Sequence, residues 1–455
     1  MGLLTRVKEY TVYQTVDALV GLAARGARRN VDATLRKMLE YCLKLTNDRV
    51  WTAVVKDLLR KLNEGHPAMG LARRFLTELN PTVRSKLVLC LFVEGTLLGP
   101  KRRHAMESDL GYYPPSTLVI SPSMRCPLKC YGCYAGSYGK EDELTFEDVD
   151  TIVRDAKELG MYFLVLSGGE PFAWKPLMRV LEAHNDVYFL VYTSGLLLDD
   201  ATVDRLAELG NCCPAISCEG FEKETDERRG KGAFKKVERA MRRLAKRGVV
   251  VSFSATATRH NMDTITSDRF IDYLIDAGCM MGWYFSYIPI GRDPDLDLMP
   301  TPEQRVHLSR RVKELRAQKA ITLIDFWNDG EFSGGCIAGG RKYLHINNKG
   351  DVEPCVFCHF ATDNIKETPL KDALASDFFT AIRARQPYDE DLRRVCIMID
   401  NPSVLREVVA ETGARGTHEG AESLIHEFAE PLDKYADEFG KALRNGPVCN
   451  IVNRV

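Results

Sequence analysis

The stretch "MRCPLKCYGCYA", residues 124–135, places three cysteines close together at Cys126, Cys130 and Cys133. It directly follows the short apolar run "TLVIS" at residues 117–121. Three thiolates without a fourth beside them do not complete the four-ligand set that structural zinc prefers. They suit a [4Fe-4S] cubane, in which three thiolates leave one iron open to a non-protein ligand. The stretch therefore predicts an iron–sulfur site on a loop after a strand.

Five further apolar runs follow along the chain, separated by helix-like stretches such as "FEDVDTIVRDAKELG" and "FKKVERAMRRLAKRG". Alternation of this kind predicts repeated βα units and a parallel sheet, in a barrel or an open arrangement. In both arrangements the functional loops leave the carboxyl ends of the strands, and the cysteine loop occupies such an end. The five runs are "MYFLVLS" (161–167), "DVYFLVYTS" (186–194), "CCPAISC" (212–218), "VVVSFSATA" (249–257) and "GWYFSYIPI" (282–290).

The chain has 455 residues, of which 45% are hydrophobic and 27% charged, as in a globular protein of about two or three domains. Residues 1–110 show helical spacing, for example at Leu35, Leu39 and Cys42, and predict a helical N-terminal domain. That domain is basic: residues 1–105 hold 19 Lys and Arg against 9 Asp and Glu, although the whole chain has a net charge of -1. The N-terminal region and the rest of the chain therefore differ in the sign of their net charge.

No apolar run approaches the length of a membrane span, and the N-terminus lacks an apolar signal-peptide core. We therefore expect a cytoplasmic protein, in which fourteen cysteines indicate metal binding rather than a disulfide scaffold. The scattered cysteines have no ligand spacing and are interpreted as small buried apolar side chains. They are Cys42, Cys90, Cys212, Cys213, Cys218, Cys279 and Cys449.

The C-x3-C-x2-C spacing after the first strand of a βα series resembles the signature of the radical S-adenosylmethionine (radical SAM) enzymes. The resemblance implies a partial (β/α)6 TIM-like barrel over residues 111–320. It also implies that the open iron of the cluster binds SAM, which is cleaved reductively to methionine and a 5′-deoxyadenosyl radical. That radical removes a hydrogen atom from an unreactive carbon, and the electron comes from a low-potential donor of the flavodoxin or ferredoxin type.

Further stretches match the family at the expected strand ends and imply residues that bind SAM. "SGGEP" places Gly168, Gly169 and Glu170 where the family contacts the SAM amino group, since glycines admit close backbone approach and a carboxylate pairs with an ammonium. "YTSG" puts Thr193 and Ser194 at a matching position.

"ISCEG" followed by "TDERRGKGAF" resembles the family pattern in which Ser217 and Arg229 would bind the SAM carboxylate and ribose region. One departure concerns Gly132, because the family usually has an aromatic residue just before the third cysteine. Tyr131 or Tyr134 is expected to take over that contact with adenine. Tyr134 is the residue carried into the predicted cofactor site.

A second group of cysteines lies in residues 321–400 and resembles the auxiliary-cluster extensions called twitch or SPASM domains. The predicted ligands of one auxiliary [4Fe-4S] cluster are Cys336, Cys355 and Cys396, with Cys358 as a candidate fourth ligand. The stretch "YLHINNKGDVEP" (343–354) predicts a hairpin beside them. A structural zinc site built from the same four cysteines stays open as an alternative. His359 is interpreted as a surface or capping residue rather than a ligand.

Two helical segments complete the predicted organisation. Thr301, with Gln304 three residues later, predicts a capped helix that runs to about residue 320. Residues 401–455 predict a C-terminal helical tail.

The predicted function is a radical SAM enzyme, with a lipid hydrocarbon chain as first-choice substrate and carbon–carbon bond formation as the outcome. The reason is the basic region 1–105, which could lie against anionic lipid headgroups as a peripheral membrane-surface contact. Modification of a peptide or protein is the alternative. An alternative outside the enzymes is a non-catalytic protein, either an iron–sulfur electron carrier or a SAM-binding protein. No nucleic-acid partner is predicted.

Overall fold

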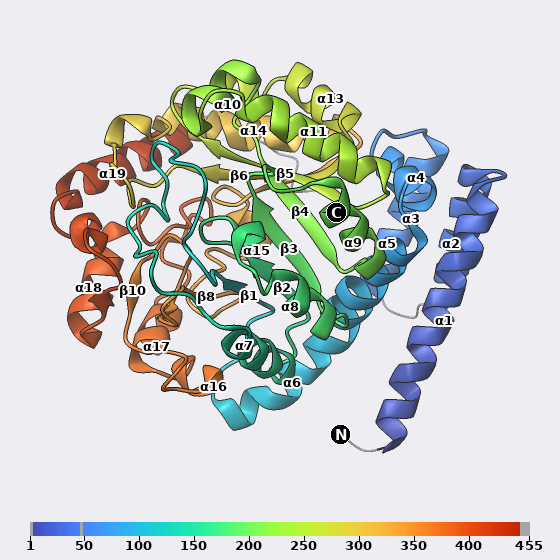
Figure 1. The fold of residues 1–455 in the computed structure, drawn as a ribbon, viewed down its shortest axis with the longest axis horizontal. Helices are drawn as coiled ribbons and strands as arrows, with labels where there is room; N and C mark the ends of the chain where they lie inside the picture. The colour runs from blue at the N-terminus through green and yellow to red at the C-terminus, as the bar shows by residue number, and fades with distance from the viewer. Residues whose placement is uncertain (1–2, 46–48, 446–455) are drawn as a thin grey trace.

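The computed structural model describes residues 3–45 and 49–445. Its first part is helical, as predicted, and α1 and α2 stand at one edge of the molecule (Figure 1). Part of this region packs around a small core of its own, formed by Ala23, Ala27, Leu35, Leu62, Met69 and Leu76. The helices are α1 (Leu3–Ala27), α2 (Val31–Leu45), α3 (Arg49–Asn63), α4 (Met69–Thr77), α5 (Pro81–Lys86), the π-helix η1 (Leu87–Leu98) and α6 (Gly99–Leu110).

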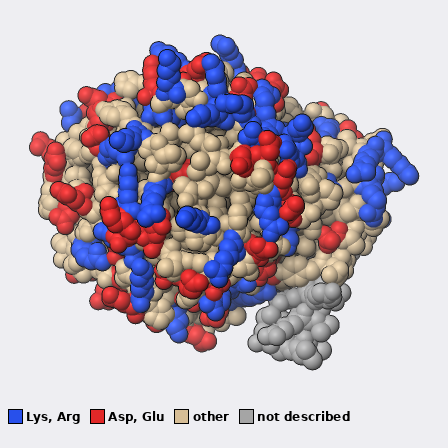
Figure 2. Space-filling view, in the orientation of Figure 1, with Lys and Arg blue, Asp and Glu red and all other residues tan. Residues whose placement is uncertain are grey.

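The charges of the N-terminal helices are partly paired with one another. Arg73 lies 2.6 Å from Asp32, and Arg60 lies 2.5 Å from Asp57. On the face of the molecule shown in Figure 2, Lys and Arg are interspersed with Asp and Glu. Across the part of the chain that the structure describes, no helix is both long enough and apolar enough to cross a membrane.

All six predicted strands form, and they pair in parallel in sequence order. The prediction of an α/β fold with a mostly parallel sheet is confirmed, and helices cover the outside of the sheet (Figure 1). The strands are β1 (Thr117–Ile120), β2 (Phe163–Leu166), β3 (Tyr188–Thr193), β4 (Cys212–Ser217), β5 (Val251–Ala257) and β6 (Cys279–Ser286).

The connections between these strands are mostly helical. They comprise α7 (Phe146–Glu158), the 3-10 turn η2 (Pro171–Ala173), α8 (Leu177–Ala183), α9 (Asp200–Leu209), α10 (Glu222–Arg229), α11 (Ala233–Lys246), α12 (Met262–Ile265) and α13 (Asp268–Asp276). After β6 come η3 (Leu296–Leu298) and α14 (Pro302–Gln318). The predicted capping box of α14 is present, because the side chains of Thr301 and Gln304 each accept a hydrogen bond from the other's backbone N–H.

The sheet continues beyond residue 320, so the predicted boundary between barrel and auxiliary domain cuts a continuous structure. β7 (Thr322–Asp325) pairs in parallel with β6 at one edge. At the other edge β8 (His345–Ile346) pairs in parallel with β1, and β9 (Val352–Glu353) pairs antiparallel with β8. The predicted hairpin is therefore confirmed, and it covers an edge of the sheet that would otherwise expose unpaired backbone groups.

The remaining elements close the C-terminal part around the same continuous core. β10 (Phe360–Ala361) pairs with β11 (Arg415–Gly416), which ties the tail to the auxiliary region. The buried guanidinium of Arg305 on α14 pairs with the buried carboxylate of Asp400. The helices here are α15 (Gly330–Ser333), α16 (Leu370–Ala373), α17 (Asp377–Ala384), α18 (Pro402–Thr412), η4 (Ala421–Leu424) and α19 (Ala429–Asn445). The end of the predicted tail, with Cys449, lies outside the described residues.

Candidate active site

An interior cavity of about 220 Å³ lies inside the curved sheet and reaches the cysteine loop. Successive side chains of a strand point to opposite faces, so every second residue of the strands faces this space. Polar residues gather at the cysteine end, including Ser167, Thr193, Ser194, Ser217 and Thr256. Apolar and aromatic side chains form much of the remaining wall: Val119, Phe163, Val165, Leu190, Tyr192, Trp283, Phe285, Phe326, Ile337, Val356 and Phe357.

Cys126, Cys130 and Cys133, the three predicted ligands of one cluster, all line this cavity. Burial raises the pKa of the Cys126 thiol to about 11. Burial also raises the pKa of Cys130, although the positive charges of Arg229 and Arg228 oppose the shift. The thiols of Cys126 and Cys130 are therefore protonated at neutral pH, and a metal cluster must displace those two protons when it binds.

Gly168 and Gly169 bring the end of β2 against the backbone of the cysteine loop. A Cβ atom at Gly168, where φ is 105°, would lie 2.5 Å from the carbonyl oxygen of Ser123. A Cβ atom at Gly169 would lie 2.4 Å from the carbonyl oxygen of Arg125. The backbone N–H of Gly169 donates to Ser123 at 2.9 Å. Both glycines line the cavity, and their lack of a side chain lets the end of β2 lie directly against the backbone of the cysteine loop.

Glu170 is fully buried and its carboxylate is directed at the loop after β3 rather than into the cavity. It accepts hydrogen bonds from the hydroxyl of Thr193 at 2.7 Å and from the backbone N–H of Ser194 at 2.8 Å. The hydroxyl of Ser194 and the N–H of Phe172 donate to it as well. Thr193 and Ser194 line the cavity. The structure thus places Glu170 behind them, where it fixes their positions.

Ser217 and Arg229 lie at the cavity, and Arg229 belongs to a buried charge cluster that the sequence did not reveal. The carboxylate of Glu219 is fully buried and accepts hydrogen bonds from Arg228 at 2.6 Å and from Arg229. Burial alone would raise the pKa of Glu219, but the two arginines hold it below its usual value. Arg228 also donates to the hydroxyl of Thr256 and to the backbone carbonyl of Gly132.

Glu219 and Arg228 are therefore the functional residues that the sequence prediction missed. Their signal was present in "CEG" and in the pair "RR", since an acid at a strand end and two adjacent cations suggest a buried ion pair. The net result is one positive charge at the cavity, held in place by a carboxylate.

Of the two tyrosines considered for the adenine contact, only Tyr134 lines the cavity. Its hydroxyl lies 2.7 Å from the Oγ atom of Ser167. Tyr131 is 45% exposed and donates to Asp295 at 2.6 Å. At Gly132 a Cβ atom would lie 2.7 Å from the ring of Tyr287, so an aromatic side chain from the end of β6 occupies the space beside this glycine.

The four auxiliary cysteines come together in the C-terminal part. Cys336, Cys355 and Cys396 line a small cavity of about 40 Å³. Cys358 is fully buried beside them, and its backbone N–H donates to the carbonyl of Cys355 at 3.0 Å. Within residues 3–45 and 49–445, no three His, Cys, Asp or Glu side chains form a group that could hold one metal ion. A cubane makes a different demand, because each thiolate binds its own iron.

A buried polar network ties the auxiliary hairpin to the cysteine loop. Glu353 accepts hydrogen bonds from Tyr138 at 2.8 Å and Thr417 at 2.6 Å, and it lies 2.6 Å from His345. His345 in turn contacts Ser121 at the end of β1.

The prediction that His359 is a surface or capping residue is wrong. The side chain is fully buried, and its Nδ1 atom lies 2.7 Å from Nε2 of His418. Burial lowers the pKa of His359 to about 3.

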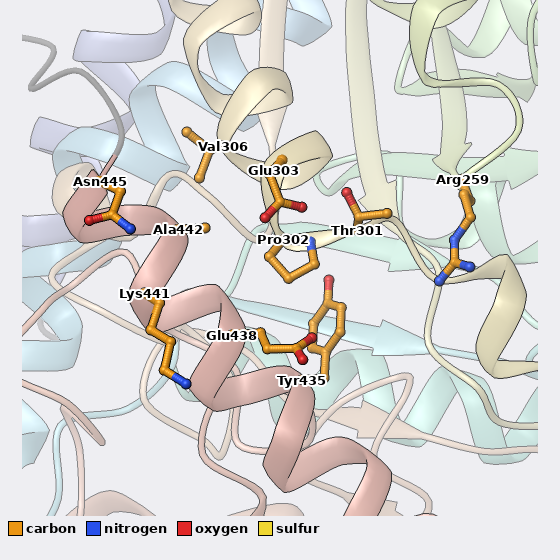
Figure 3. A pocket seen from close by; sticks show the side chains of 10 residues that line it. All are labelled: Arg259, Thr301, Pro302, Glu303, Val306, Tyr435, Glu438, Lys441, Ala442 and Asn445. Carbon is orange, nitrogen blue, oxygen red and sulfur yellow. The ribbon is translucent and has the colours of Figure 1, made fainter.

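A second and larger hollow, of about 640 Å³, lies at the surface between the start of α14 and α19 (Figure 3). Charged side chains border it, among them Arg259, Glu303, Glu438 and Lys441. None of the site residues predicted from the sequence belongs to the described residues that line it. The chemistry implied by clustered thiols therefore lies in the interior cavity.

The cavity and its cysteines coincide with regions that match known proteins. Residues 120–274 match the radical SAM superfamily, and residues 336–397 match SPASM, an iron-sulfur cluster-binding domain. Over 300 residues the chain is 28% identical to PqqA peptide cyclase of Granulibacter bethesdensis, which covers 60% of this chain and 76% of that protein. It is 24% identical to AdoMet-dependent heme synthase of Methanosarcina barkeri, with 57% and 81% covered.

Among solved structures, the fold is similar to that of SuiB of Streptococcus suis bound to precursor peptide SuiA. The TM-score is 0.55 at 18% sequence identity, and the match covers 76% of this chain and 84% of that chain. At this identity the likeness concerns the fold.

Proposed function

Because the chain belongs to the radical SAM superfamily and carries a SPASM domain, we propose that this enzyme removes a hydrogen atom from a side chain of a peptide substrate. Its cofactors are a [4Fe-4S] cluster, SAM and an auxiliary iron–sulfur cluster. When bound, the first cluster and SAM supply reductive cleavage and hydrogen-atom abstraction. The protein's residues hold these groups, orient the substrate and exclude water.

The donor sets of the chain fit these groups. In this proposal Cys126, Cys130 and Cys133 hold the SAM-binding cluster, since their thiols share one cavity end. Gly168 and Gly169 hold the loop against the end of β2 and line the cavity beside it.

Side chains around the cavity complete the proposed SAM site. Thr193 and Ser194 offer hydroxyl groups that Glu170 positions. Ser217 and Arg229 present a hydroxyl and a cation suited to a carboxylate, and Tyr134 supplies an aromatic wall.

Four cysteines are proposed as ligands of the auxiliary cluster: Cys336, Cys355, Cys358 and Cys396. The SPASM match favours this cluster over the structural zinc site.

The observation that carries the choice of a peptide is the composition of the cavity beyond the thiols. Its wall is apolar and aromatic, and the charged groups among its described lining residues, Arg228 and Arg229, are paired with Glu219. An uncharged side chain fits this space. Trp283 also lines it, and the Nε1 atom of Trp283 is buried without an acceptor among the described residues.

Such an unpaired donor costs about 1–3 kcal/mol. The Nε1 atom has almost no accessible surface in this arrangement, so a peptide carbonyl would satisfy it once the indole ring turns toward the cavity, whereas a hydrocarbon chain offers no acceptor.

The expected lipid substrate gains no support. PqqA peptide cyclase and the peptide-bound SuiB favour the alternative, modification of a peptide. The ion pairs of the N-terminal helices leave the excess of Lys and Arg over Asp and Glu in residues 1–105 unchanged, so the lipid prediction still rests on that charge alone.

A low-potential donor of the flavodoxin or ferredoxin type remains our proposal for the reductant. The cysteine loop exposes Lys129 and Tyr131 at the surface, so the neighbouring cluster would lie within reach of such a protein.

Deuterium transfer tests the substrate class. The anaerobic holoenzyme, with SAM and dithionite, is given either the peptide fraction or the lipid extract of source cells grown in deuterated medium. We expect deuterium in 5′-deoxyadenosine with the peptide fraction, and only protium with the lipid extract. Deuterium transfer from the lipid extract alone would contradict the proposal.

A further inference from the structure

The auxiliary site and the interior cavity share a wall one side chain thick. Phe326 and Ile337 line both the interior cavity and the small cavity beside the auxiliary thiols. Tyr343 lines the interior cavity, and its hydroxyl donates a hydrogen bond to the sulfur of Cys355 at 2.7 Å. One aromatic side chain thus joins the proposed substrate space to a proposed ligand of the auxiliary cluster.

The surroundings of Tyr343 fix this geometry. The side chain is 2% exposed, and its ring packs edge-on against Phe326 with the ring centroids 5.8 Å apart. Its backbone N–H donates to the carbonyl of Ile337, and its carbonyl accepts from Gly340. A rigid donor of this kind holds its hydrogen bond in a constant direction, as a group that tunes a metal site requires.

We propose that Tyr343 sets the reduction potential of the auxiliary cluster through its hydrogen bond to Cys355. Reduction adds negative charge to the cluster and its thiolates, so a donated hydrogen bond stabilises the reduced form and raises the potential. Tyr343 acts through Cys355 and is a positioning residue. Because its ring also faces the interior cavity, the potential is tuned from the side on which substrate binds.

The backbone N–H groups of Phe357 and Cys358 also interact with the sulfur of Cys355, and Phe357 lines the interior cavity, so Tyr343 is the side-chain donor beside two backbone donors at this ligand. Trp327 interacts with the sulfur of Cys396 and lines the small cavity, and the N–H of Met398 donates to the same sulfur at 3.4 Å. Tyr388 lies near the thiols of Cys336 and Cys358, but its hydroxyl accepts a hydrogen bond from Gln386. Tyr388 therefore offers a matched control: a tyrosine beside the cluster that is bonded elsewhere.

The test is a potentiometric titration followed by electron paramagnetic resonance, on anaerobically reconstituted wild type, Tyr343→Phe and Tyr388→Phe. It needs no substrate, so its result is independent of the proposed peptide. In Tyr343→Phe we expect the auxiliary cluster's reduction equilibrium to become about tenfold less favourable, which is about 59 mV for a one-electron couple. The potential of the SAM-binding cluster and the iron content should stay unchanged. Tyr388→Phe should leave both potentials unchanged.

An unchanged auxiliary potential in Tyr343→Phe with full iron content would overturn the proposal. An equal shift of the auxiliary potential in Tyr388→Phe would overturn it too, since loss of any nearby hydroxyl group would then have the same effect as loss of the hydrogen bond to Cys355. If Tyr343→Phe fails to assemble the auxiliary cluster, 3-fluorotyrosine at position 343 replaces it, because this stronger donor of nearly the same shape should raise the potential. No shift with 3-fluorotyrosine would contradict the role assigned to the hydroxyl.

Discussion

The carboxylate of Glu170 accepts two hydrogen bonds from Ser194, one from its backbone N–H and one from its hydroxyl. Glu170 comes from the end of β2 and Ser194 from the end of β3, so one buried carboxylate joins two neighbouring strand ends at the cavity. A ligand that contacts Ser194 therefore depends on a residue that does not itself line the cavity.

Glu170→Gln should weaken SAM binding by about tenfold to a hundredfold, because hydrogen bonds to a charged group contribute about 1.5–3 kcal/mol. The glutamine side chain would also place its NH₂ group, a donor, against the donor groups of Ser194 or Thr193 that now bond to a carboxylate oxygen. Equilibrium dialysis of labelled SAM against the anaerobic holoprotein measures the effect. Glu147→Gln, at an exposed carboxylate on α7, is the control and should bind SAM like the wild type. An unchanged affinity for SAM in Glu170→Gln would show that SAM binding does not depend on the hydrogen bonds between Glu170 and Ser194.

Glu219→Gln should destabilise the protein by about 3–5 kcal/mol, because it leaves Arg228 and Arg229 without their buried counter-charge. The folded-state pKa of Glu219 lies below the usual 4.5, so the ion pairs stabilise the protein above that pH and are lost only as the pH falls through the folded value. The difference from wild type should therefore be the same at pH 8 and pH 5.5.

Anaerobic calorimetry at both pH values checks this prediction. Glu222→Gln, in the exposed first turn of the same helix α10, should change stability by less than about 0.5 kcal/mol. A stability difference for Glu219→Gln that vanished at pH 5.5 would mean that Glu219 is already protonated there.

Trp283→Phe should reduce deuterium transfer from the peptide fraction by about tenfold, which corresponds to one lost hydrogen bond of about 1.4 kcal/mol. Formation of 5′-deoxyadenosine without peptide should be unaffected, because the thiols and the SAM-binding side chains are untouched. Trp174→Phe is the matched control, since the Nε1 atom of Trp174 already donates to Leu144. If Trp283→Phe and wild type transferred the same amount of deuterium from the peptide fraction, the indole N–H of Trp283 would not bind the substrate.

Cys358→Ser addresses whether the auxiliary cluster is closed by four thiolates. All four cysteines lie together, and the spacing of Cys355 and Cys358 suits a shared metal centre. We expect wild type to hold about eight irons per chain as two four-iron clusters, and the variant to weaken or lose the auxiliary cluster alone. Iron analysis and paramagnetic resonance measure this. A variant with full iron content and an unchanged auxiliary spectrum would rule out ligation by Cys358.

Local sequence patterns predicted the parts of this protein that depend on neighbours along the chain. Apolar runs predicted the six strands, because burial of a central parallel strand demands continuous hydrophobic residues. The two-residue strands β8 and β9 carry the predicted hairpin, whose turn chemistry at Gly350 was visible in the sequence. The pairing of β8 with β1 was not visible, since no local pattern in the sequence encodes a partner strand so far away along the chain.

The same limit explains the errors at the site. His359 is buried because His418 and Tyr138, distant in sequence, pack against it. Glu170 matched a motif, but its direction depends on the loop of another strand. The preference for a lipid rested on the charge of residues 1–105, and composition says which surfaces attract one another rather than what a cavity accepts.

The most direct test of the central claim is 5′-deoxyadenosine formation by the anaerobic, reconstituted protein with dithionite and SAM, compared between wild type and Cys130→Ala. Wild type should form 5′-deoxyadenosine and methionine, and the variant should form neither, because two remaining thiolates cannot hold the SAM-binding cluster. The auxiliary cluster of Cys130→Ala should persist in its paramagnetic resonance spectrum, which shows that the protein is folded. SAM cleavage by the variant, or none by a wild type that holds both clusters, would contradict the account.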